Sequence, residues 1–226
     1  MRTFLKKIAS YLPKSIQHSL KRRYFSYQIR NNTFRTDEPE FAYVDKVLKE
    51  CDWVIDIGAN IGHYTLRFAE LVGPQGRVIA FEPVPETFDL LSSNVWQKKY
   101  RNVTLINAAA SDVTRLAGMD IPSFDTGLEN YYMAHLTQNA NGLQVLCLQV
   151  DGLSLLHPVS LVKIDAEGHD FVVLNGMKAL LERDRPVVII EEDSENIKNF
   201  MSRLGYQFSR LPASHNALYR YEPENE

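Results

Sequence analysis

The stretch VIDIGANIGHYT, Val54 to Thr65, decides the fold of this chain. An apolar run ends at Asp56, Gly58 and Gly62 then bracket Asn60, and a helical pattern follows. This order predicts a strand, a tight glycine turn and a helix start, where backbone N–H groups and the positive helix end face a ligand. Because a side chain on either glycine would hold a ligand away from the backbone, the turn favours ligand binding.

The spacing of the glycines argues against a dinucleotide ligand. Dinucleotide-binding folds carry G-x-G-x-x-G, whereas this chain has G-x-x-x-G with Asp56 ahead of it. A carboxylate at the strand end repels pyrophosphate, but it suits a ligand with an ammonium group and a sulfonium centre, such as S-adenosylmethionine. An ordinary strand–helix turn, in which glycine only permits tight packing, is the alternative interpretation.

Two further strand ends carry polar groups. RVIAFEP, residues 77–83, predicts a second strand that ends at Glu82, 24 residues beyond Gly58. An acid at about that distance binds the two ribose hydroxyls in open α/β sheets. VTLINAAASD, residues 103–112, predicts a third strand whose exit carries Asp112. Three polar strand ends at one sheet edge favour a site for a nucleoside-containing cofactor over an ordinary strand–helix turn in which glycine only permits tight packing.

After residue 50 the chain alternates strands and helices, which predicts a parallel sheet with right-handed crossovers. Strands are predicted near 52–58, 77–82, 103–107, 145–150, 160–165, 186–191, 206–210 and 216–221, and helices near 62–72, 85–97, 168–182 and 194–204. The segment 118–142 is the least patterned. Its Phe124, Tyr131, Tyr132 and His135 suit either a surface for a sugar ring or a cap on the sheet edge.

Five segments together resemble the FkbM family of S-adenosylmethionine-dependent methyltransferases: VIDIGANIGHYT, FEPVPETFDLLSSNV, NAAASD, LVKIDAEGHDFVVLNGM and RPVVIIEE. The resemblance runs from about Trp53 to Glu192, and K-I-D-x-E-G at 163–168 is its most family-specific block. It implies an α/β, Rossmann-like class I methyltransferase fold: a mostly parallel sheet, helices on both faces and an antiparallel C-terminal hairpin. One departure is Asp170, where the family usually has Glu.

The resemblance also implies an activity and a cofactor site. The activity is methyl transfer to an oxygen, often a hydroxyl group on a sugar or natural product. Carried over by position, the cofactor loop consists of Asp56, Gly58, Asn60 and Gly62, the ribose ligand is Glu82, and the residue beside the adenine is Asp112.

Ionisable residues gather at the ends of the fourth and fifth core strands of the sheet. They are Lys163, Asp165, Glu167 and His169 on one, and Glu191, Glu192 and Asp193 on the other. So many charges would repel one another unless they were paired, protonated or bridged by a cation. Perturbed groups of this kind tend to mark functional sites.

Two mechanisms fit these strand ends. In the first, Asp165 or His169 is the general base for the acceptor hydroxyl, and Lys163 neutralises the neighbouring carboxylates. In the second, Asp165 with Glu191 or Glu192 holds Mg²⁺, which lowers the pKa of the bound hydroxyl. A plain ion pair at Lys163 and a solvated His169 are the simpler alternative.

Composition and charge limit the function. The 226 residues, 45% hydrophobic and 23% charged, fit one α/β domain. Residues 1–36 hold nine Lys or Arg and no acid, whereas the remainder holds 16 bases against 28 acids. We therefore divide the chain into a basic, partly amphipathic N-terminal arm, residues 1–36, and a methyltransferase domain, residues 37–226.

The basic arm has two interpretations. One helical face would combine Phe4, Leu5, Ile8, Tyr11 and Leu12. Such a helix either lies on an anionic membrane surface or packs on the domain. No run approaches the roughly 20 apolar residues of a membrane span, and the start lacks the apolar core of a secretion signal. We therefore expect a cytoplasmic protein, and the arm leaves open peripheral contact with the inner membrane face.

The expected acceptor is a hydroxyl group of a glycan or a small natural product. Nucleic acid is not expected as a partner, because the domain is acidic and lacks a recognition motif. The N/D-P-P-aromatic run of many N-methyltransferases is absent, since the chain reads DAEGHD from residue 165. Other acceptors (nitrogen, lipid or protein) and a non-catalytic cofactor-binding module at a membrane are the remaining alternatives.

Overall fold

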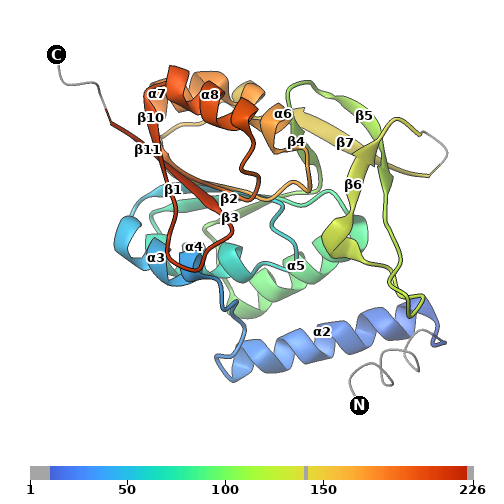
Figure 1. Ribbon diagram of the computed structural model, residues 1–226. Coiled ribbons are helices and arrows are strands. Elements are labelled where there is room, and N and C mark those ends of the chain that lie inside the picture. Colours follow the sequence, from blue (N-terminus) through green and yellow to red (C-terminus); the bar gives the residue numbers. More distant parts are fainter. Residues whose placement is uncertain (1–10, 140–141, 223–226) are drawn as a thin grey trace.

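A seven-stranded sheet runs through the centre of the structure, a computed structural model that describes residues 11–139 and 142–222 (Figure 1). In spatial order its strands are β10 (Tyr206–Ser209), β11 (Ala217–Tyr221), β9 (Val187–Ile190), β8 (Val159–Ile164), β1 (Trp53–Ile57), β2 (Arg77–Phe81) and β3 (Val103–Ile106). The strands from β9 to β3 are parallel, and β11 pairs antiparallel with both β9 and β10. The predicted parallel sheet and its antiparallel C-terminal hairpin are confirmed.

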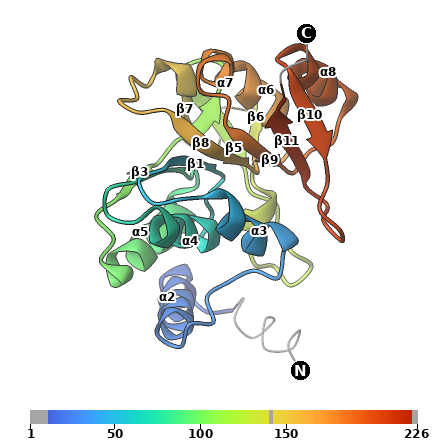
Figure 2. The same ribbon diagram turned by 90° about the vertical axis from the view of Figure 1, so that its left-hand side faces the viewer.

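Helices cover both faces of this sheet (Figures 1 and 2). One face carries α6 (Asp170–Asn175), α7 (Lys178–Asp184) and α8 (Glu195–Arg203), and the other carries α3 (Pro39–Val47), α4 (His63–Val72) and α5 (Pro85–Lys98). Side chains of a strand alternate between faces, so Ile55 and Ile57 join the core under α6–α8, whereas Val54 packs with α3 and α4. Burial on both faces explains why the strands read as continuous apolar runs.

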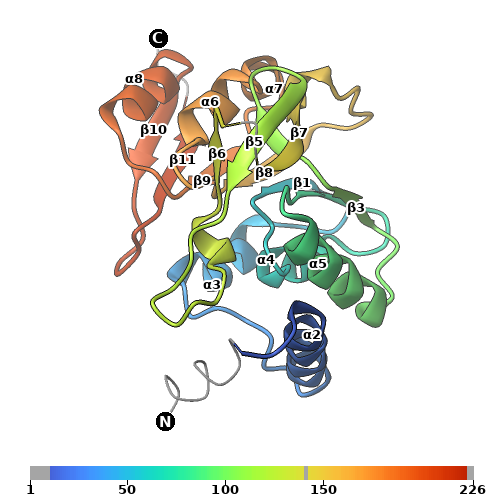
Figure 3. The same ribbon diagram turned by 90° about the vertical axis from the view of Figure 1, so that its right-hand side faces the viewer.

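A second, four-stranded sheet lies beside α6 (Figure 3). Its strands, in spatial order, are β4 (Ala109–Ser111), β7 (Leu143–Gln149), β5 (Arg115–Asp120) and β6 (His135–Thr137). The segment 103–112 is therefore not one strand, since β3 and β4 belong to different sheets. Asn107 turns the chain between them by donating its side-chain amide to the carbonyls of Glu82 (2.8 Å) and Pro83 (3.1 Å).

The predicted single helix over residues 168–182 is two helices, α6 and α7. Asp151, in the 3₁₀ turn η2 (Val150–Gly152), accepts hydrogen bonds from the backbone N–H groups of Ala179 and Leu180, both at 2.9 Å. This carboxylate caps the first turn of α7 and so gives it a start of its own.

Helix α2 (Lys14–Arg30) packs on α5, outside the layer formed by α3–α5 (Figures 1 and 2). Arg22 donates to the Ser93 hydroxyl at 2.7 Å, and Gln97 donates to the carbonyl of Ser26 at 3.0 Å. Most of the apolar face predicted for Phe4 to Leu12 lies outside the described residues. Within the described ranges, no helix is both long and apolar enough to span a bilayer.

Candidate active site

The carboxyl ends of three central strands meet at one cavity. Its walls come from the residues after β1 (Gly58, Asn60), after β2 (Glu82, Pro83, Val84), after β8 (Asp165, Ala166, Glu167, His169) and from 108–110. A hollow adjoins this cavity, shares Gly58, Asn60, Tyr132 and Asp165 with it, and is also lined by Asp56 and Lys163. The structure therefore brings together all the predicted cofactor and catalytic residues except Gly62 and Asp112.

The glycine turn is shaped by contacts within the protein. Gly58 has φ +73°, and a Cβ there would lie 1.9 Å from the carbonyl oxygen of Asp165. At Gly62, with φ +94°, a Cβ would lie 2.6 Å from Leu91 Cδ1. At Gly58 the backbone of the protein itself leaves no room for a side chain, whereas at Gly62 the overlapping atom is the end of the flexible Leu91 side chain. That a side chain would also hold a ligand away from the turn stays a prediction. The turn nevertheless lines the cavity through Gly58.

Asp56 has an acceptor oxygen without a partner. Its side chain is buried, and Oδ2 accepts a 2.6 Å hydrogen bond from the Thr65 hydroxyl. Within the described part of the chain, Oδ1 has no hydrogen-bond partner. Burial raises the pKa of Asp56 to about 6. A buried acceptor left unpaired is unfavourable, so this oxygen beside the hollow fits the ammonium group of S-adenosylmethionine.

Glu82, the predicted ribose ligand, follows β2 and lines the cavity. Its Oε2 accepts from the backbone N–H of Asn60 and its Oε1 from that of Val84, both at 2.9 Å. Each carboxylate oxygen has a second lone pair, so the side chain can still accept two hydroxyl groups. Burial raises the pKa of Glu82 to about 7. The residues present therefore fit the nucleoside and the amino end of S-adenosylmethionine.

Asp112 is exposed and does not line the cavity; its proposed place beside the adenine stays a prediction. The neighbouring Ser111 is buried instead, and its hydroxyl lies 3.0 Å from His169 Nε2. Burial lowers the pKa of His169. Both candidate bases thus line the same cavity, with His169 on the side of β4 and Asp165 beside the glycine turn.

Lys163 forms a buried ion pair with Asp165. Its side chain is 6% exposed, and Nζ lies 2.9 Å from Asp165 Oδ2 and 4.9 Å from the centre of the Tyr64 ring. Burial acts against both charges, but Asp165 and Asp56 raise the pKa of Lys163, and Lys163 holds the pKa of Asp165 below its usual value. Asp165 is therefore ionised at neutral pH.

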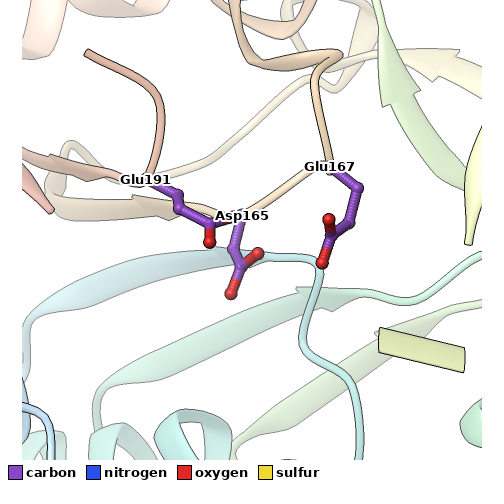
Figure 4. Close-up of side chains that lie close together, drawn as sticks. All are labelled: Asp165, Glu167 and Glu191. Atoms are coloured by element: carbon purple, nitrogen blue, oxygen red, sulfur yellow. The ribbon is translucent and has the colours of Figure 1, made fainter. Parts of the chain in front are cut away.

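Asp165 also belongs to a group of three carboxylates (Figure 4). Oxygens of Asp165, Glu167 and Glu191 all lie within 4.8 Å of one another. The predicted metal ligand Glu192 is not in this set: its backbone N–H donates to Asp170 at 3.1 Å. Burial, followed by the charge of Asp165, raises the pKa of Glu191 to about 8. A proton on Glu191 thus relieves the repulsion at neutral pH.

The unusual Asp170 joins the two strand ends. It is buried, and its Oδ1 accepts from the backbone N–H of Ala166 at 2.8 Å while Oδ2 accepts from that of Glu192. Since these N–H groups follow β8 and β9, one carboxylate fixes both loops that carry the cluster. The Asp170 side chain therefore serves to hold the backbone of these two loops in place.

Two segments contribute lining residues from outside the predicted cofactor and catalytic sets. Tyr131 and Tyr132, in the 3₁₀ turn η1 (Tyr131–Met133), and His135 line the cavity, whereas Phe124 does not. Thr36 and Glu38, between α2 and α3, line the hollow. The aromatic content of 118–142 was a signal for the first group, but nothing in the sequence marked the second.

Comparisons with known proteins identify the family of this chain. The family model described as Methyltransferase FkbM domain matches residues 56–208. The hexuronic acid methyltransferase AglP of Haloferax volcanii is 28% identical over 148 residues, which cover 62% of this chain and 56% of the relative. A protein-L-isoaspartate O-methyltransferase of Methanothrix thermoacetophila is 37% identical over 59 residues, or 26% of this chain and 28% of the relative. The chain spans about half the length of these curated relatives, or less.

Solved structures show the same fold at low sequence identity. The FkbM methyltransferase of Methylobacillus flagellatus KT has a TM-score of 0.56 at 15% identity, over 80% of this chain and 50% of that chain. A putative rRNA methylase of Clostridium thermocellum has a TM-score of 0.53 at 14% identity, over 80% and 90%. A putative methyltransferase of Streptococcus mutans in complex with SAH has a TM-score of 0.50 at 13% identity, over 80% and 94%. The predicted class I methyltransferase fold is confirmed, and the chain belongs to the FkbM family of S-adenosylmethionine-dependent methyltransferases.

Proposed function

We propose that this chain transfers a methyl group from S-adenosylmethionine to a hydroxyl oxygen of a glycan or a small natural product. The observation that carries the proposal is the ionised Asp165, paired with the buried Lys163, on the wall shared by the cavity and the hollow. The glycine turn after β1 touches the same Asp165. A hydroxyl entering the hollow would therefore meet a proton acceptor next to the methyl donor.

The chemistry requires a modest base in a fixed position. When bound, S-adenosylmethionine supplies a methyl group on a positively charged sulfur, which the hydroxyl oxygen displaces in line. The hydroxyl becomes strongly acidic as its oxygen bonds to carbon, so a carboxylate of low pKa suffices to take its proton. Lys163 holds Asp165 ionised and in place, which supplies the orientation that such a displacement needs.

Two acidic residues would bind the donor. Glu82 would accept both ribose hydroxyls while it keeps its bonds to Asn60 and Val84. Asp56 would accept the ammonium group through Oδ1, its unpaired oxygen.

The charge of the lining bears on the acceptor. Glu38, Asp165 and Glu167 line the two spaces, and Lys163, their neighbouring cation, is already paired. An uncharged or cationic acceptor suits this lining better than an anionic one, because a carboxylated acceptor would meet like charge. The acceptor would thus differ in charge from the hexuronic acid in the name of AglP.

A mechanism through Mg²⁺ has less support than direct proton transfer. Lys163 neutralises Asp165 and a proton neutralises Glu191, so of the three carboxylates only Glu167 is left for a divalent cation to balance. We expect methyl transfer to persist in EDTA. Loss of transfer in EDTA, with recovery on addition of Mg²⁺, would favour the metal mechanism.

The proposal is tested by separating donor binding from turnover. Labelled S-adenosylmethionine, offered with a panel of sugar and polyketide hydroxyls, identifies an acceptor, and calorimetry measures donor affinity. Asp165→Asn should lower turnover by about 100-fold or more while donor affinity is kept. Glu192→Gln, outside the cluster, is the matched control and should behave as the wild type.

Three outcomes would count against parts of the proposal. Wild-type protein that does not bind S-adenosylmethionine would overturn the donor site. Unchanged turnover in Asp165→Asn would exclude Asp165 as the proton acceptor. If turnover is lost in His169→Ala but kept in Asp165→Asn, the proton acceptor is His169.

A further inference from the structure

The outer side of α2 carries a row of exposed apolar side chains. Ile16, Leu20, Tyr24 and Tyr27 are 45%, 48%, 58% and 62% exposed. Their spacing of four, four and three residues places them on one side of the helix. We call these four residues the outer stripe.

The opposite side of α2 makes the contacts with the domain. Ile29 is buried there, Arg22 bonds to Ser93, and Ser26 accepts from Gln97. The views in Figures 1 and 3 agree that α2 lies at the edge of the molecule, with α5 on its inner side. The outer stripe therefore faces away from the protein.

Positive charge accompanies the outer stripe. The helix carries Lys14, Lys21, Arg22, Arg23 and Arg30 and no acid. Arg23 and Arg30 are exposed and, by helical spacing, border the outer stripe. Lys14 and Lys21 turn toward the loop of the second sheet: Lys14 pairs with Glu129 at 2.6 Å, and Lys21 lies 4.6 Å from the centre of the Tyr131 ring.

Helix α2 lies close to one wall of the cavity. Lys21 Nζ lies 4.6 Å from the centre of the Tyr131 ring, and Tyr131 lines the cavity. A surface on which α2 docks would therefore lie near the wall of the proposed acceptor space.

We propose that the outer stripe of α2 docks on an anionic lipid surface. The four apolar side chains would enter the boundary between headgroups and acyl chains, and Arg23 and Arg30 would meet the lipid phosphates. A second copy of this chain is a poorer occupant, because two such helices would bring arginine against arginine. The inference goes beyond methyl transfer and locates the cavity at a membrane surface.

The test is flotation of the full chain with lipid vesicles at low salt. Binding is expected to phosphatidylcholine vesicles that contain phosphatidylserine, and to be much weaker without it. Each arginine near the surface contributes roughly a fivefold change in partitioning, so Arg23→Gln with Arg30→Gln should weaken binding about 25-fold. Leu20→Ser with Tyr27→Ser should also abolish flotation.

Controls come from exposed residues elsewhere. Leu156→Ser, at a side chain 84% exposed, and Arg203→Gln, also exposed, should float as the wild type does. Titration with S-adenosylmethionine confirms that each variant is folded, and flotation itself needs no methyl transfer.

Two results would overturn the inference. One is a flotation result: the wild-type protein fails to float with the anionic vesicles, or the outer-stripe variants float as well as the wild type does. The other is a dimer in solution that Leu20→Ser with Tyr27→Ser converts to a monomer, which would make a second copy the occupant.

Discussion

Gly58→Ala tests whether the cofactor turn and the catalytic strand end are packed against each other. An added Cβ would lie 1.9 Å from the carbonyl oxygen of Asp165 and 2.9 Å from its carbonyl carbon. Both are backbone atoms, so no side-chain rotation can relieve the overlap. The end of β8 or the turn itself has to move.

The cost has two parts. A residue with a Cβ at φ +73° loses about 1–2 kcal/mol relative to glycine. Forcing an extra carbon into a packed site costs about 1–3 kcal/mol more. The free energy of unfolding should therefore fall by roughly 2–5 kcal/mol, and at about 2–4 °C per kcal/mol the Tm should fall by roughly 10 °C.

Gly168→Ala is the matched control. Gly168 has φ +82°, but a Cβ there would have no heavy atom within 4 Å. It carries the backbone strain without the overlap, so it should lose about 1–2 kcal/mol only. Urea unfolding of both variants gives the difference. Equal losses in Gly58→Ala and Gly168→Ala would refute the argument that packing against Asp165 requires this glycine.

The remaining predictions concern the acidic groups of the site. Affinity for S-adenosylmethionine should fall about tenfold per pH unit below pH 7, because burial raises the pKa of Glu82 to about 7 and the protonated form accepts fewer hydroxyl bonds. Calorimetry across this range checks it, and Glu82→Gln should bind weakly at every pH; a flat wild-type profile would contradict the role of Glu82. Asp170→Ala should lower the free energy of unfolding in urea by roughly 2–6 kcal/mol, since it leaves two N–H groups unpaired at about 1–3 kcal/mol each. If the free energy of unfolding falls only as much as it does when an exposed helix cap is removed, the role of Asp170 in holding both loops is contradicted. Lys163→Met should weaken both donor binding and turnover, whereas Asp165→Asn should lower turnover alone; equal donor affinities in the two variants would show that Lys163 acts on Asp165 only.

The convergence of Asp56 and Glu82 at one sheet edge was predictable because it is encoded locally. Asp56 and Glu82 each stand at the end of an apolar strand, and parallel strands place such ends at one edge of the sheet. The second sheet was not predictable in the same way. Its strands β4 and β6 have three residues each, and β4 pairs with β7 across more than 30 residues, so neither leaves a clear periodic pattern.

The choice between Glu191 and Glu192 shows a second limit. Successive residues at a strand end point to opposite sides of the sheet, so only one of the two can join Asp165. A shift of one residue in the strand end exchanges them, and the sequence does not fix strand ends that closely. In the structure Glu191 joins the cluster, and Asp170 fixes the backbone at Glu192.

The position of Lys163 joins the two halves of the site. It pairs in register with Asp56 across β1 and β8, and it lies two residues before Asp165 on the same side of its strand. Its one charge therefore acts on both Asp56, the proposed partner of the donor's ammonium group, and Asp165, the proposed base for the acceptor. The backbone repeats this connection, since the N–H of Asp165 donates to the Ile57 carbonyl at 3.1 Å and its own carbonyl abuts Gly58. The turn after β1, proposed to bind the donor, and the end of β8, proposed to act on the acceptor, thus form one packed unit, so a displacement on either side must disturb the other.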